Sequence, residues 1–61
     1  MLVRQGNQIR TDDAEFPVSF YWLGERLYIE FGAENYTALN NAEARQLLNY
    51  ITEGLEVYDR R

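Results

Sequence analysis

The sequence predicts an α+β fold, in which a small antiparallel sheet of three or four strands carries one C-terminal helix packed on one of its faces. Two observations lead to this prediction. Apolar and polar residues alternate over residues 16–31, on both sides of Gly24-Glu25, which is the period-2 pattern of two half-buried strands. Residues 41–55 instead repeat apolar side chains at the spacing of an amphipathic helix. The 61 residues suffice for a single domain, covering residues 1–61.

The N-terminal segment is the least regular part of the pattern. Residues 2–10 could form either one irregular strand or a small hairpin that turns at Gly6-Asn7. We expect an edge strand here, because its arginines would protect an open hydrogen-bonding edge. Residues 11–15 predict a turn or a single helical turn, since Asp and Thr side chains bond nearby backbone amides. Pro17 then stands at the beginning of the next strand, where a missing amide is tolerated.

The central hairpin has a register that its own apolar face determines. A two-residue turn at Gly24-Glu25 has Gly first, as a type II′ turn requires. A slip of one residue would move the apolar side chains to the other face, so the buried face selects one pairing. That pairing puts six apolar residues on one face, as the pairs Val18 with Phe31, Phe20 with Ile29, and Trp22 with Leu27.

Residues 32–35 predict a second turn, and residues 36–39 a further short strand. Asn40 is the expected N-cap of the helix, because Glu43 three residues later completes a capping box.

The helix runs from residue 41 to at least residue 53. Gly54 could end it as a left-handed cap or lie inside it. Continuation toward Tyr58 is favoured, because Leu55 keeps the apolar stripe in phase. This stripe is expected to cover the apolar face of the hairpin, and it consists of Ala44, Leu47, Leu48, Ile51 and Leu55.

One helix cannot cover both faces of a sheet, so we expect the reverse face of the hairpin to stay open. Tyr21 and Tyr28 lie opposite each other on it, in the company of Ser19, Leu23, Arg26 and Glu30. Tyrosine is common at interfaces, because its ring supplies buried area while its hydroxyl tolerates water. Two interpretations stay open: a surface for a partner or a second copy, or a tyrosine pair that only stabilises the hairpin.

The composition argues against catalysis. The chain has no His, Cys or Lys, which removes the common general base, the thiol nucleophile, the Schiff-base amine and the soft metal ligands. No phosphate-binding loop or EF-hand pattern is present. Asp12, Asp13 and Glu15 could hold a hard cation weakly, but a solvated turn is the better interpretation. We therefore expect no catalytic residue, no metal site and no cofactor.

The charge distribution suggests the kind of partner. The net charge is −4, and residues 11–59 hold all ten carboxylates against Arg26 and Arg45, which leaves a local balance of −8. Such an acidic surface repels phosphate backbones, so direct binding of nucleic acid is not expected. A basic surface on another protein would instead attract this chain. Solubility alone is a simpler explanation of the acidity. No apolar run reaches the length of a membrane span, and we expect a cytoplasmic protein without a membrane partner.

These observations predict a non-catalytic binding protein. The leading hypothesis is a small acidic inhibitor that covers a basic nucleic-acid-binding surface of a larger protein, with carboxylates where phosphates would lie. Its size and charge are analogous to those of phage-encoded anti-CRISPR and anti-restriction proteins. The alternative is a homodimeric accessory or structural module joined through the Tyr21/Tyr28 face. The candidate partner-binding residues are Tyr21, Tyr28, Arg26, Glu30, Asp12, Asp13, Glu15, Glu25 and Glu34.

Overall fold

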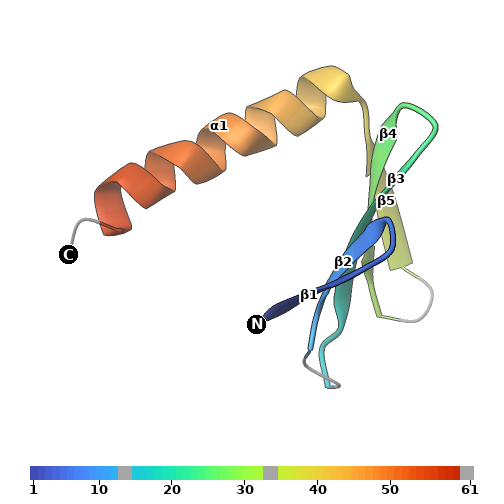
Figure 1. Ribbon diagram of the computed structural model, residues 1–61. Coiled ribbons are helices and arrows are strands. Elements are labelled where there is room, and N and C mark those ends of the chain that lie inside the picture. Colours follow the sequence, from blue (N-terminus) through green and yellow to red (C-terminus); the bar gives the residue numbers. More distant parts are fainter. Residues whose placement is uncertain (13–14, 33–34, 60–61) are drawn as a thin grey trace.

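The computed structural model describes residues 1–12, 15–32 and 35–59. Within these residues, five strands form one antiparallel sheet, and one helix follows it (Figure 1). Each strand lies beside the next one in the chain. The α+β class and the antiparallel sheet are confirmed. The elements are β1 Leu2–Gln5, β2 Gln8–Thr11, β3 Val18–Leu23, β4 Arg26–Phe31, β5 Asn35–Leu39 and α1 Asn41–Tyr58.

The predicted number of strands is too low. Residues 2–11 form a hairpin, β1 paired with β2, instead of the single edge strand that we expected. The apolar-polar alternation of these residues is too weak to predict the hairpin, because both strands have only four residues and β1 is exposed throughout. Ala33 and Glu34 of the predicted second turn lie outside the described residues, as do Asp13 and Ala14 of the predicted first turn.

Glycines make the tight turns of this sheet possible. Gly6, between β1 and β2, has φ of 61°, and Gly24, between β3 and β4, has φ of 64°. No described non-glycine residue has a positive φ. In each of these two turns, the positive φ therefore occurs only at the first turn residue, which is the glycine. This is the type II′ pattern, which suits the twist of paired strands. The predicted register of β3 with β4 is confirmed in all its pairs, from Val18 with Phe31 to Leu23 with Arg26.

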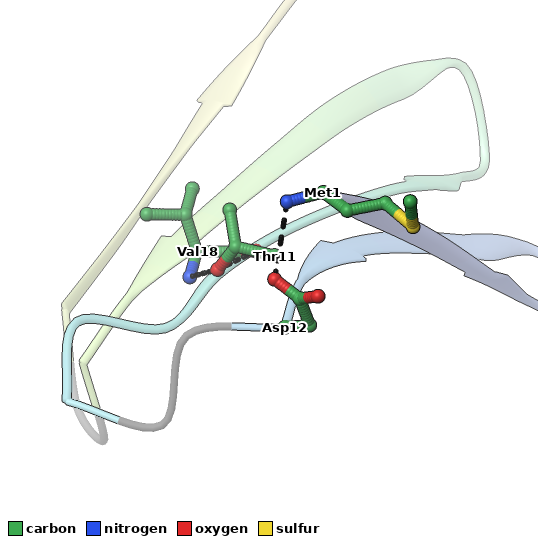
Figure 2. A network of polar contacts seen from close by, with 4 residues as sticks. All are labelled: Met1, Thr11, Asp12 and Val18. Carbon is green, nitrogen blue, oxygen red and sulfur yellow. Dashed lines mark hydrogen bonds and ion pairs between the residues drawn. The ribbon is translucent and has the colours of Figure 1, made fainter.

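Polar contacts join the strands at the end of the sheet where β2 leads into β3. Figure 2 shows the Thr11 Oγ1 atom accepting a hydrogen bond of 2.9 Å from the Val18 amide. The Met1 ammonium lies 3.1 Å from Asp12 Oδ1, and the Asp12 amide donates to the Met1 carbonyl oxygen. The Thr11 hydroxyl thus continues the pairing of β2 with β3, whose backbone register ends at Arg10 and Ser19.

The predicted capping box at the start of α1 is confirmed. The Glu43 amide donates to Asn40 Oδ1 over 2.8 Å, and the Asn40 amide donates to Glu43 Oε1 over 3.0 Å. The two side chains therefore satisfy two amides that lack partners within the helix. The helix also continues through Gly54 to Tyr58, as the phase of its apolar stripe favoured.

The predicted packing of the helix on the sheet is wrong. Figure 1 shows α1 leaving the sheet obliquely, with its C-terminal end well away from the strands. Among the described elements, α1 contacts β4 and β5 alone. Leu48, Ile51 and Leu55 of the expected buried stripe are 57%, 48% and 57% exposed. Asn40 is the one residue between β5 and α1, whereas βα connections usually have about 2–6 residues, so there is little chain with which to turn the helix back.

The protein therefore has an extended shape for its size. No described side chain is fully buried. The radius of gyration is 12.9 Å, whereas a compact domain of this length would have about 10.5 Å. Partial burial is concentrated on β2, β3 and β4 and at the end of β5. Among the described residues, no helix combines the length and apolar character needed to cross a membrane.

Alanine at two glycines should change stability in opposite directions. Gly24→Ala puts a side chain into the left-handed region and should lower the free energy of unfolding by about 1–2 kcal/mol. Gly54→Ala adds a Cβ that meets no atom within 4 Å and should raise it by about 1 kcal/mol, because alanine favours the helix. Urea unfolding of both variants at one protein concentration checks this, and a stabilising Gly24→Ala would contradict the turn assignment.

Candidate protein-interaction surfaces

Tyrosines from three neighbouring strands line one face of the sheet, which we call the tyrosine face and define by Tyr21, Tyr28 and Tyr36. Tyr21 and Tyr28 are directly paired across β3 and β4. Their rings stack with centroids 5.4 Å apart and an interplanar angle of 4°. Tyr36 is paired with Glu30, so it is a diagonal neighbour of Tyr28, and their centroids lie 5.9 Å apart. The predicted tyrosine pair is thus part of a longer row.

Tyr36 is the site residue that the sequence analysis missed. Its strand was predicted, but its partners depend on the register of β4 with β5, which pairs Tyr28 with Ala38. The alternation within residues 36–39 is too short to specify that register. Tyr36 is 64% exposed, whereas Tyr21 and Tyr28 are half-buried, so it is the most accessible ring of the row.

A hydrogen bond holds one end of this row in place. The Tyr21 hydroxyl donates to Glu30 Oε1 over 2.6 Å. This bond to the carboxylate favours the protonated phenol and, with partial desolvation and the negative charge of Glu30, raises the pKa of Tyr21 to about 12. The tyrosine face therefore presents stacked rings with one hydroxyl already engaged, which lowers the entropy that a partner must overcome.

The other predicted site residues are spread over the molecule. Arg26 lies at the beginning of β4, paired with Leu23, and Glu25 is exposed in the adjoining turn. Asp12 lies at the opposite end of the hairpin, where the Met1 ammonium is its ionic partner. Glu15 is exposed in the connection between β2 and β3, and it lines a shallow hollow together with Phe16 and Pro17. The structure thus brings together Tyr21, Tyr28 and Glu30, but separates the acidic residues.

Two predicted residues, Asp13 and Glu34, lie outside the described residues. Over the part of the chain that is described, no group of three or more acidic side chains is arranged to hold a metal ion.

A second surface, which the sequence analysis expected to be filled, is an open groove on the other side of the sheet. It lies between the sheet and the first half of α1, and its volume is about 610 Å³. We call it the apolar groove. Trp22, at its sheet side, is 46% exposed. Its lining residues are Trp22, Leu27, Asn41, Ala44, Arg45, Leu47, Leu48 and Ile51.

One carboxylate of the helix, that of Glu53, lies on the side away from this groove. By helical periodicity, Glu53 lies on the side of α1 opposite Leu48 and Ile51. Arg45 is the charged residue in the lining. The groove can therefore be covered without removing the Glu53 carboxylate from water.

Known proteins offer no guide to either surface. Protein-family models, curated proteins and solved structures were compared with this chain, and none of them matches. The roles of the tyrosine face and the apolar groove must therefore be argued from their own chemistry.

The shifted tyrosine gives a pH prediction. The pKa of Tyr21 is about 12 in the folded protein and about 10 in the unfolded chain. The protonated phenol therefore contributes to the stability of the fold below pH 10, and this contribution is lost as the pH rises from about 10 to about 12. Glu30→Gln should bring the pKa of Tyr21 back toward 10 and flatten this loss. Ultraviolet titration of tyrosinate checks the shift, with Tyr21→Phe identifying the late-titrating group. An unchanged titration in Glu30→Gln would contradict the assigned cause.

Proposed function

We propose that this chain is a non-catalytic binding protein that acts by covering a surface of a larger protein. The observation that carries the proposal is the row of stacked tyrosines, which lies on the sheet face away from α1. Stacked rings supply large contact area with few rotatable bonds, and this is why tyrosine is enriched at binding interfaces. Tyr36 would be the first ring to contact the partner, because it is the most exposed of the three.

The charge of the chain supports a basic partner surface. The net charge is −4, and Glu53 and Glu56 are both exposed on α1. Their attraction to a basic surface would speed encounter and orient the approach, while the tyrosine face supplies the contact. Because phosphate backbones would be repelled, nucleic acid is expected as a competitor for the partner and not as a ligand of this chain.

In its sharpest form, the proposal describes an inhibitor of a nucleic-acid-handling protein, of the phage-encoded anti-CRISPR or anti-restriction kind. Size and acidity support it by analogy. The carboxylates that the structure describes do not form one strip, since Asp12 and Glu15 lie at the opposite end of β3 from Glu25. A tyrosine-centred contact with an acidic surround is therefore favoured over close imitation of a nucleic-acid backbone.

A homodimer joined through the tyrosine face is the alternative. Tyr21 and Tyr28 already cover each other and are half-buried, whereas larger apolar side chains are exposed in the apolar groove. Self-association has more to gain on the groove side, and we therefore assign the tyrosine face to a different protein.

The proposal predicts how binding responds to substitution and to salt. For a partner isolated from the host, Tyr36→Ala should weaken binding at least about tenfold, as expected for the loss of an interface anchor. Tyr50→Ala, which removes an exposed tyrosine of α1, is the matched control and should leave it unchanged. Rising salt should weaken binding, and Glu53→Gln with Glu56→Gln should reduce that salt dependence, because exposed charges are screened.

Calorimetric titration of the purified partner measures these affinities, and displacement of a labelled duplex from the partner tests competition. An affinity indifferent to salt would refute the basic surface. Equal effects of Tyr36→Ala and Tyr50→Ala would refute the assignment of the tyrosine face. Retention of the duplex by this chain alone would refute the proposal that nucleic acid is only a competitor.

A further inference from the structure

We propose that two copies of this chain pair through the apolar groove, each placing its helix on the sheet of the other. The proposal is independent of the function proposed above, which uses the opposite face of the sheet. We call the two apolar surfaces involved the helix stripe and the apolar sheet face. The helix stripe consists of Ala44, Leu47, Leu48, Ile51 and Leu55, and the apolar sheet face of Val18, Phe20, Trp22, Leu27, Ile29 and Phe31.

Each of these surfaces is the kind of partner that the other requires. An amphipathic helix normally buries its apolar stripe against a sheet face or another helix, and a one-sided apolar sheet face is normally covered by a helix. Here α1 meets the sheet only near its own N-terminus, among the described residues. The second halves of both surfaces remain open, as the exposure of Leu55, 57%, and Phe31, 47%, shows.

The chain cannot easily close the groove with its own helix. Leu39 ends β5 and Asn41 begins α1, so the direction of the helix is set by a single connecting residue. The reciprocal hydrogen bonds between Asn40 and Glu43 hold that residue in its capping geometry. Folding α1 over its own sheet would therefore have to change the backbone at or next to this residue. A helix from a second copy meets no such restriction.

The exposed area matches what a stable dimer needs. The chain has an accessible surface of 5453 Å². A compact monomer of 7.2 kDa would expose about 4,100 Å². The excess is about 1,300 Å² per copy, or about 2,600 Å² for two copies, and it includes residues outside the groove such as Phe16. Obligate homodimers bury about 2,000–5,000 Å². Excess surface of this size is expected for an isolated chain if each copy completes the core of the other.

The charges are compatible with this pairing. Glu53 lies on the far side of α1 from the helix stripe, so its carboxylate would stay in water. Arg45, in the groove lining, can extend its guanidinium past the rim while its stem covers apolar surface. The contact uses the same two surfaces on each copy, so a two-fold axis closes it and no filament follows. The two tyrosine faces would point outward.

The wild-type protein contains its own reporter of this contact. Trp22 is the single tryptophan of the chain, and it lies in the groove with 46% of its surface exposed. Sedimentation and Trp22 fluorescence are measured together from about 1 µM to about 200 µM, a range in which association equilibria shift by mass action. We expect a particle of about 14.4 kDa, twice the 7.2 kDa of the chain, to form as Trp22 emission shifts to shorter wavelength and acrylamide quenching falls.

A matched pair of helix variants locates the contact. Leu48→Glu puts a charge into the helix stripe, and it should raise the dimer dissociation constant at least about 100-fold, which corresponds to about 2.7 kcal/mol. Gln46→Glu adds the same charge on the far side of α1 and should change it less than about threefold. Leu55→Ala is a milder variant in the same stripe, and it should weaken the dimer even if Leu48→Glu fails to fold.

Each contrary result would overturn the proposal. A monomer at every concentration with Trp22 exposed would leave the groove to another protein. A monomer with Trp22 protected at every concentration would show that the chain closes on its own helix. A dimer that Tyr36→Ala dissociates, while Trp22 stays accessible, would place the contact on the tyrosine face. Support requires a dimer in which Trp22 is protected, and weakening of that dimer by Leu55→Ala but not by Gln46→Glu.

Discussion

The connection between the sheet and the helix is the constraint on which the rest of this structure depends. Asn40 alone joins β5 to α1, and its side chain and amide both bond to Glu43. A helix that begins this abruptly keeps the direction that its capping residue sets, and here that direction leads away from the strands. The apolar groove and the exposed helix stripe both follow from this geometry. A longer connection would have allowed a conventional two-layer domain with an enclosed core.

The sheet separates two kinds of surface because its side chains alternate from one face to the other. Trp22 and Leu27 lie on the groove side, and their neighbours Tyr21 and Tyr28 stack on the other. Aliphatic side chains gain most when they are removed from water, whereas a tyrosine hydroxyl can stay in contact with water at the edge of an interface. The two faces are thus suited to different partners: the groove to a second apolar layer, and the tyrosine face to a contact whose rim stays wet.

Stability and association are linked in a chain that buries so few of its side chains. The backbone hydrogen bonds of the sheet, the stacked tyrosines and the capping box order the described elements, but none of them substitutes for a buried core. Cross-strand pairs contribute about 0.2–1 kcal/mol each, which is small against the entropy of ordering 61 residues. Anything that covers the apolar groove would therefore stabilise the fold as well as bind to it. For so small a chain, the bound state and the most stable state are expected to coincide.

Elements that depend on near neighbours could be predicted from the residues alone. The period-2 pattern and the Gly24 turn predicted the register of β3 with β4, Asn40 and Glu43 predicted the start of α1, and the phase of Leu55 favoured its passage through Gly54. Tyr36 joined the tyrosine row only through the register of β4 with β5, which four residues of alternation could not specify. The strand number and the placement of α1 were likewise decided in three dimensions. Apolar periodicity shows that a helix must be covered, but the direction set at a one-residue connection decides whether its own sheet can cover it.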